Sequence, residues 1–187
     1  MRAFIISMPR SGTYLLAELL TNWSMTNTLY HFSEDFLEVR TPESIREKRL
    51  STDQVQQNPD DYYKKILFNQ FAVGHLSPSQ TNRDRLRDFK KILLVRDPHE
   101  CQRSLAEWSE QIGHQIDFLG SHKQIPSWAC YEPDIFLLHF DDLISENIDK
   151  LDSLQKFLFG DVVHSSEFTI RKSRLSETFT KNHRYRK

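Results

Sequence analysis

The chain has 187 residues, a length typical of a single domain. Its 25 Lys and Arg residues nearly balance 26 Asp and Glu, which excludes a protein that coats DNA with a uniformly basic surface. The two cysteines, Cys101 and Cys130, are too few for a disulfide scaffold and lack the spacing of a metal site. No apolar run is long enough to cross a bilayer and no signal peptide is visible, so we expect a soluble, cytoplasmic protein without a membrane partner.

Basic charge is concentrated at the C-terminal end. Residues 171–187 contain seven Lys and Arg residues against Glu177 alone, a net charge of +6 that leaves −7 for residues 1–170. Either this segment is a solvated tail, or its first part folds back over an anionic ligand. We therefore predict one domain, 1–187, with a basic tail at about 171–187.

The hydrophobic pattern predicts strands that alternate with helices. In chain order we expect a strand at Ala3–Ser7, a turn at Met8–Gly12, a helix at Thr13–Trp23, weak helical patterns near Pro42–Leu50, a helix from Asn58 to about Gln70, strands at Phe71–His75 and Lys91–Val95, a helix from Asp97, a strand at Asp134–Phe140 and a helix at Ser145–Phe159. This order predicts an α/β fold with a three-layer, mostly parallel central sheet flanked by helices. Ligands of such sheets bind beyond the carboxyl ends of the strands, so the residues that follow each strand are the candidates for a site.

The first of these candidates is the turn 9–13. A turn between a strand and a helix directs backbone N–H groups and the helix dipole at one point, which suits a phosphate or a sulfate. Arg10 adds a guanidinium, Ser11 and Thr13 add hydroxyl groups, and Gly12 permits a close approach of the ligand. The turn lacks the spacing of a Walker A loop. An ordinary capped turn with a surface arginine is the alternative.

The second candidate follows the strand Lys91–Val95. Arg96 comes directly after this strand, and Ser104 follows eight residues later, two turns into the next helix. An arginine there can hold an anion through two hydrogen bonds, and the serine can donate another. Alternatively, Arg96 pairs with Asp97 or another surface acid.

Together, three segments resemble the sulfotransferase superfamily, which uses 3′-phosphoadenosine 5′-phosphosulfate (PAPS). SMPRSGTYLLAELL resembles its 5′-phosphosulfate loop, KKILLVRDPHECQRSL its 3′-phosphate motif, and DIFLLHFDDLISENIDKLDSLQKFLF its later strand and helix. The resemblance extends from Arg2 to about Gly160. It implies a P-loop-like nucleotide-binding fold, PAPS as the co-substrate, and sulfuryl transfer to a hydroxyl or amine of a small-molecule or carbohydrate acceptor.

The resemblance also assigns roles to residues. It implies that the 5′-phosphosulfate is held by Arg10, Ser11, Gly12, Thr13 and Tyr14. It places Arg96 and Ser104 at the 3′-phosphate, with Arg171 and Lys172 as a possible basic replacement for the family's C-terminal segment. By analogy with phosphoryl transfer, Arg10 and the backbone amides neutralise the leaving group, so we expect no metal ion.

Two residues compete for the role of catalytic base. Phe71–Pro78 resembles the segment that carries the histidine base of cytosolic members, which maps this role to His75. Carbohydrate-type and bacterial trehalose-type members place a glutamate base soon after the first helix, where Glu34 lies. His31 could orient either group. In the structural alternative, His75 bonds to the backbone and Glu34 is an exposed loop acid.

The chain departs from the family in three respects, the first being that its basic segment at Arg171 lacks the glycines of the family's C-terminal segment. Leu15 stands where many cytosolic members have a tryptophan that stacks on adenine, and the chain is shorter than most members. Two alternative functions remain: a P-loop kinase or NTPase, against which the missing Walker lysine argues, and a non-catalytic relative that binds 3′-phosphoadenosine 5′-phosphate (PAP). Nucleic acid is not an expected partner, although the basic tail would allow weak contact.

Overall fold

The computed structural model describes residues 1–40, 55–56, 58–112 and 122–162. The pattern near Pro42–Leu50 and the basic tail with Arg171 and Lys172 lie outside the described residues. Within the described ranges, no helix is long and apolar enough to cross a membrane.

The centre of the molecule is a seven-stranded sheet in the order β4-β3-β2-β5-β1-β6-β7. The strands are β1 (Ala3–Ser7), β2 (Thr26–Phe32), β3 (Leu37–Val39), β4 (Val55–Gln56), β5 (Gln70–Gly74), β6 (Lys90–Val95) and β7 (Phe136–His139). The five strands from β2 to β7 in this order are parallel, and the two pairings at one edge, of β2 with β3 and of β3 with β4, are antiparallel. The predicted mostly parallel α/β sheet is confirmed.

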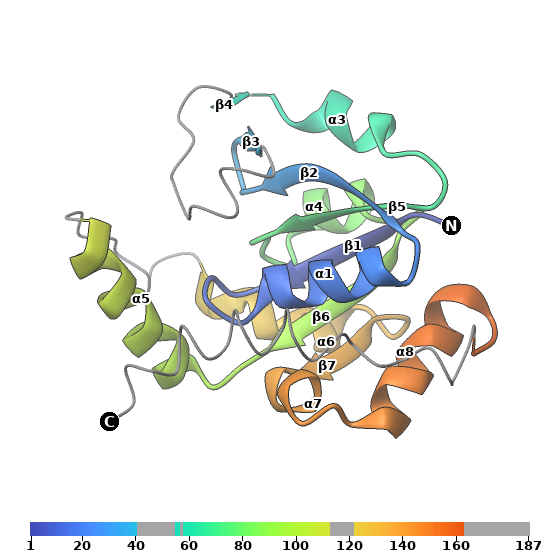
Figure 1. The fold of residues 1–187 in the computed structure, drawn as a ribbon. Coiled ribbons are helices and arrows are strands. Elements are labelled where there is room, and N and C mark those ends of the chain that lie inside the picture. The colour runs from blue at the N-terminus through green and yellow to red at the C-terminus, as the bar shows by residue number, and fades with distance from the viewer. Residues whose placement is uncertain (41–54, 57, 113–121, 163–187) are drawn as a thin grey trace.

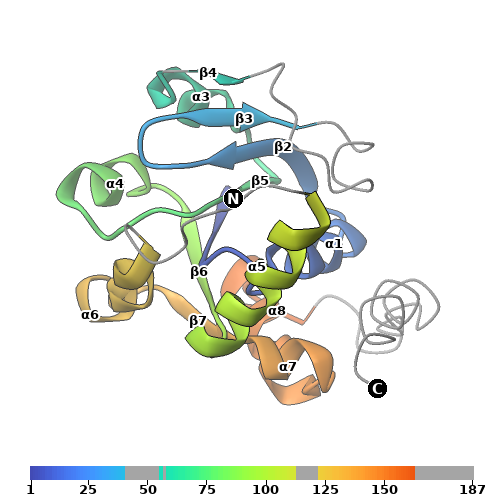
Figure 2. The same cartoon turned by 90° about the vertical axis from the view of Figure 1, so that its left-hand side faces the viewer.

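Helices cover both faces of the sheet (Figures 1 and 2). They are α1 (Thr13–Asn22), α3 (Asp60–Lys65), α4 (Gln80–Arg85), α5 (Pro98–Ile112), the 3-10 helix η1 (His122–Ser127), α6 (Trp128–Tyr131), α7 (Phe140–Ile144) and α8 (Ile148–Phe159). Successive side chains of a strand point to opposite faces, and β1 accordingly sends Ile5 into one core and Phe4 into the other.

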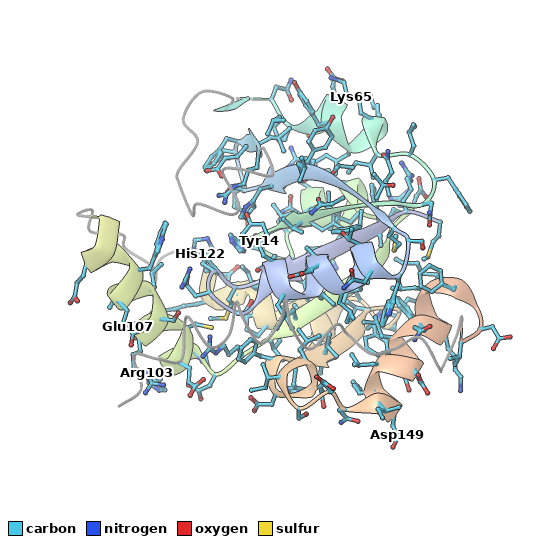
Figure 3. All side chains as sticks on the ribbon, viewed as in Figure 1. Tyr14, Lys65, Arg103, Glu107, His122 and Asp149 are labelled. Atoms are coloured by element: carbon cyan, nitrogen blue, oxygen red, sulfur yellow. The ribbon has the colours of Figure 1, made fainter. Side chains whose placement is uncertain are left out.

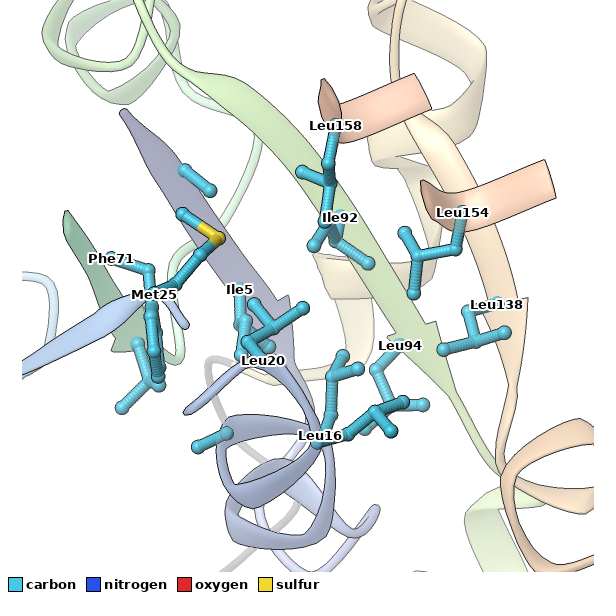
Figure 4. Packing of buried hydrophobic residues seen from close by; sticks show 14 of the residues in the cluster. Ile5, Leu16, Leu20, Met25, Phe71, Ile92, Leu94, Leu138, Leu154 and Leu158 are labelled. Atoms are coloured by element: carbon cyan, nitrogen blue, oxygen red, sulfur yellow. The ribbon is translucent and has the colours of Figure 1, made fainter. Parts of the chain in front are cut away.

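Each face of the sheet therefore has its own hydrophobic core. The first core joins the sheet to α1, α7 and α8. Leu20 of α1 lies near Ile5, and Leu154 of α8 lies near Leu138 (Figure 4). The second core joins the opposite face to α3, α5, η1 and α6. This arrangement of helices, sheet and helices is the predicted three-layer architecture.

Several predicted boundaries were wrong. The segment between α1 and α3 contains β2, β3 and β4, which the sequence did not predict because their residues are largely polar or the strands are short. The helix expected to reach about Gln70 ends at Lys65, because Ile66 has an extended backbone conformation, and β5 begins at Gln70. The last helix begins at Ile148 rather than Ser145, because Asn147 caps it by accepting a hydrogen bond from the Lys150 amide.

Candidate functional site

The turn after β1 is held together by its own hydroxyl groups. The Ser11 hydroxyl donates to the Met8 carbonyl at 2.6 Å, and the Thr13 and Ser7 hydroxyl oxygens lie 2.6 Å apart. Ser7, Ser11 and Thr13 are all buried. The hydroxyls of Ser11 and Thr13, which were predicted to bind a ligand, therefore shape the turn itself.

Gly12 lets this turn pass close to a neighbouring helix. Its φ of 94° lies in the left-handed region, and a Cβ at this position would stand 2.7 Å from ring atoms of Phe140. The Gly12 carbonyl accepts bonds from the Leu15 and Leu16 amides, which starts α1. Among the residues that the structure describes, the amides of Gly12, Thr13 and Tyr14 bond to no backbone carbonyl. Such amides at a helix N-terminus can bind an anion.

Arg10 and Arg96 meet beyond the carboxyl ends of β1 and β6. Arg96 Nη1 donates to the Arg10 carbonyl at 3.0 Å, and Arg10 Nε donates to the Ser104 hydroxyl at 3.2 Å. We call these three residues the two-arginine site. The Arg96 guanidinium also lies 4.2 Å from the centre of the Phe140 ring, and that of Arg10 lies 5.7 Å from the Trp108 ring.

The Arg96 guanidinium acts electrostatically on that of Arg10. Burial, followed by repulsion from Arg96, lowers the pKa of Arg10. Adjacent like charges on protein groups are unfavourable unless an anion compensates them. The two-arginine site is therefore suited to a phosphate or sulfate, and it brings together the arginines that the sequence assigned to opposite ends of one nucleotide.

The present partner of Arg96 is Glu100, one turn along the chain. Arg96 Nε and Nη2 both donate to Glu100 Oε2, at 3.2 and 2.9 Å. Asp97, the partner suggested as an alternative, instead accepts from the amides of His99 and Glu100 and so caps the start of α5. Arg96 lies two residues before α5, and Glu100 lies in the first turn of that helix.

His75 follows β5 and is held by the backbone of β1. Its Nδ1 lies 2.6 Å from the Ser7 carbonyl oxygen, which can only accept a hydrogen bond. Nδ1 therefore carries the proton, and the lone pair of the neutral ring is on Nε2. Burial lowers the pKa of His75 to about 3, so the ring is neutral at physiological pH. The neutral ring keeps a lone pair on Nε2.

Two further histidines lie beside His75, and a tyrosine bonds to one of them. The His31 ring centre lies 4.6 Å from that of His75, and the His122 ring centre lies 5.9 Å from it. The Tyr14 hydroxyl lies 2.8 Å from His31 Nδ1. Burial lowers the pKa of His31 and raises that of Tyr14 to about 12, so both groups are uncharged. Figure 3 shows Tyr14 and His122 at the same end of the sheet.

The position of His31 depends on an irregularity that the sequence did not predict. The register between β2 and β5 shifts between Asn27 and His31, and Leu29 within this bulge has a φ of 63°. Bulges commonly redirect a side chain beside a functional site. Here the shifted register ends at His31, the residue that bonds to the Tyr14 hydroxyl.

Glu34, the competing base, has both carboxylate oxygens engaged. Oε1 accepts from the Ser77 amide, and Oε2 accepts from the side-chain amide of buried Asn82 at 2.8 Å. These bonds connect the turn after β2 to α4 and to the loop before it. The carboxylate is therefore placed to stabilise the fold. Within the described part of the chain, no group of three or more His, Cys, Asp or Glu residues could hold a metal ion.

The architecture is that of the sulfotransferase-like class of P-loop-like α/β folds. It is similar to mouse sulfotransferase SULT7A1 complexed with PAP, with a TM-score of 0.59 and 19% sequence identity over 94% of this chain. It is also similar to retinol dehydratase in complex with androsterone and the inactive cofactor PAP, with a TM-score of 0.57 and 17% identity over 84% of this chain.

These similarities are structural. The chain spans 65% of the length of the first solved structure and 59% of the second. No family model matches the sequence, and no curated protein sequence matches it. At this level of identity, the comparisons establish a sulfotransferase-like fold.

Proposed function

We propose that this chain binds PAPS and catalyses transfer of its sulfuryl group to a hydroxyl or amine of a small-molecule or carbohydrate acceptor. The observation that carries the proposal is the two-arginine site, where Arg10, Arg96 and Ser104 meet beside the N-terminus of α1. Its two guanidinium groups and the nearby helix N-terminus attract the anionic groups of a nucleotide. Both solved structures named above contain PAP.

The chemistry requires positioning, charge stabilisation and a base. PAPS supplies the sulfuryl group as co-substrate. In the proposed reaction the acceptor oxygen or nitrogen forms a bond to sulfur while the bond from sulfur to the 5′-phosphate oxygen breaks. Arg10 and the amides at the start of α1 stabilise the negative charge that develops on the leaving phosphate.

His75 is the proposed base. Its Nε2 lone pair accepts the acceptor's proton, and the Ser7 carbonyl fixes the ring through Nδ1. We favour His75 over Glu34 because neither oxygen of the Glu34 carboxylate lacks a protein donor. Tyr14 and His31 are proposed to position His75, since the His31 ring packs against it and is itself held by the tyrosine.

The test is to incubate the protein with labelled PAPS and a panel of hydroxyl and amine acceptors, and to measure formation of PAP. The wild-type protein should transfer sulfate to at least one acceptor. His75→Asn should lose transfer and retain PAP binding, because asparagine can still donate to the Ser7 carbonyl but offers no lone pair at the Nε2 position.

Other outcomes identify the alternatives. PAP binding without transfer to any acceptor would favour a non-catalytic relative. Tighter binding of Mg-ATP than of PAP would favour a P-loop kinase or NTPase and contradict the proposal.

A further inference from the structure

The two-arginine site already contains a carboxylate. Glu100 Oε2 accepts from both Nε and Nη2 of Arg96, so it takes one whole edge of the guanidinium. An arginine uses the same edge when it binds two oxygens of a phosphate through two parallel bonds. The Arg96 side chain is only 13% exposed, whereas that of Glu100 is 38% exposed. The arginine is thus fixed in the site, while the carboxylate lies at its mouth.

The remaining contacts of the two residues strengthen this arrangement. Phe140 covers a face of the Arg96 guanidinium, and the Arg10 carbonyl accepts from Nη1. These contacts limit how far the guanidinium can turn away from Glu100. The second oxygen of the carboxylate, Oε1, accepts from Arg103 Nη2 at 3.2 Å, and the Arg103 side chain is 60% exposed. Glu100 can therefore move toward solvent with Arg103 as its partner.

We propose that Glu100 is an internal competitor for the 3′-phosphate of the nucleotide. In the free protein, the Glu100 carboxylate accepts the hydrogen bonds of Arg96. A 3′-phosphate must therefore displace the carboxylate or bind beside its negative charge. Glu100 thereby sets how strongly the site distinguishes a nucleotide with a 3′-phosphate from one without it. The inference rests on the proposed function, in which the product PAP keeps its 3′-phosphate; competition at Arg96 then shortens the time for which PAP stays bound.

The experiment compares two ligands and two variants. PAP and adenosine 5′-monophosphate (AMP), which lacks the 3′-phosphate, are titrated calorimetrically into wild type, Glu100→Gln and Glu110→Gln. Glu110 lies on the same helix and is exposed, so its variant makes the same change in net charge away from Arg96. Glu100→Gln should bind PAP about three- to tenfold more tightly than wild type, the range expected when a partly exposed like charge is removed from beside an anion.

Binding of AMP should change by less than about twofold in Glu100→Gln, and Glu110→Gln should match wild type for both ligands. Unchanged or weaker PAP binding in Glu100→Gln would overturn the inference and make Glu100 a residue that positions Arg96. An equal gain for AMP and PAP would also overturn it, because the effect would then not depend on the 3′-phosphate.

A further variant, Glu100→Ala, controls for new hydrogen bonds made by the glutamine amide. It should show the same increase in PAP affinity. Thermal unfolding of each variant confirms that the compared proteins are folded. If no protein in the set binds PAP, the proposed function itself fails. If all bind PAP equally, only the inference about Glu100 fails.

Discussion

Gly12 is the position in the turn where the structure leaves no room for a side chain. It combines a left-handed φ with the close approach of Phe140, whose ring also contacts Arg96. Any side chain at position 12 would therefore disturb both the start of α1 and one wall of the two-arginine site. Gly160, which ends α8, has a similar φ of 85°, but a Cβ added there would meet no described atom within 4 Å.

These two glycines form a matched pair for mutation. Gly160→Ala carries only the backbone strain of the left-handed region, about 1–2 kcal/mol. Gly12→Ala carries that strain and a clash with Phe140, and should destabilise by a further 1–3 kcal/mol, roughly the cost of overpacking. Urea unfolding measures both values. Equal losses of stability would show that Phe140 does not constrain position 12.

The sequence predicted the positions of some site residues correctly, but it did not predict the hydrogen-bond partners of others. The spacing of Arg96 and Ser104 placed both in one site, and the structure brings them together with Arg10. Ser11 and Thr13 were expected to face a ligand, but a hydroxyl in a tight turn finds a nearer partner in the backbone or in Ser7. Such local competition depends on the exact turn conformation, which sequence spacing does not specify.

At the scale of elements, the contact of the turn after β2 with α4 and the loop before it depends on Glu34. Its carboxylate accepts from the Ser77 amide and from the Asn82 side chain, and both partners are donors. In a glutamine at position 34, the side-chain NH2 group would face either the Ser77 amide or the Asn82 side chain, and both of these are donors. The carboxylate therefore matters for how the β2–β3 edge joins the rest of the sheet.

Glu34→Gln should consequently destabilise the protein by about 1–3 kcal/mol, the cost of leaving a buried donor unsatisfied, and leave PAP affinity unchanged. Asp35→Asn is the control, because Asp35 is the exposed neighbour in the same turn. Urea unfolding and PAPS turnover are measured together. Normal stability with loss of turnover in Glu34→Gln would make Glu34 the base instead of His75.

Among the elements, buried continuous strands were the most predictable. The run Ala3–Ser7 is entirely buried, and its apolar residues identify β1 without reference to any neighbour. By contrast, β2 has a polar sequence, a bulge and one partly covered face. A strand of this kind is specified by its pairing with β5 and β3, which is long-range information that local propensity does not contain.

At the scale of the whole molecule, neutral histidines link stability to pH. The pKa of His75 is lowered to about 3, and burial lowers that of His31 as well. As pH falls below about 6.5, the ordinary histidine pKa, these histidines take up protons in the unfolded chain but not in the folded one. The folded state is therefore fully favoured above that pH and loses stability as the pH falls from there toward 3.

The loss should be at most about 1.4 kcal/mol per pH unit for each of the two histidines. Urea unfolding at pH 7.5, 6.5 and 5.5, values within the range where histidine normally titrates, measures it. His75→Asn should flatten the dependence, while His99→Asn, at an exposed position of α5, should leave it unchanged. Equal stability of the wild type at all three pH values would contradict the neutral state assigned to His75.

The proposed function depends above all on Arg96 as part of a nucleotide phosphate site, and calorimetric titration with PAP decides whether it is. Arg96→Ala should weaken PAP binding by about 1.5–3 kcal/mol, the range for hydrogen bonds to charged groups. Arg87→Ala removes the same charge at an exposed ion pair with Asp84 and should bind PAP as the wild type does. Wild-type affinity in Arg96→Ala, or no binding of millimolar PAP by the wild type, would refute the assignment.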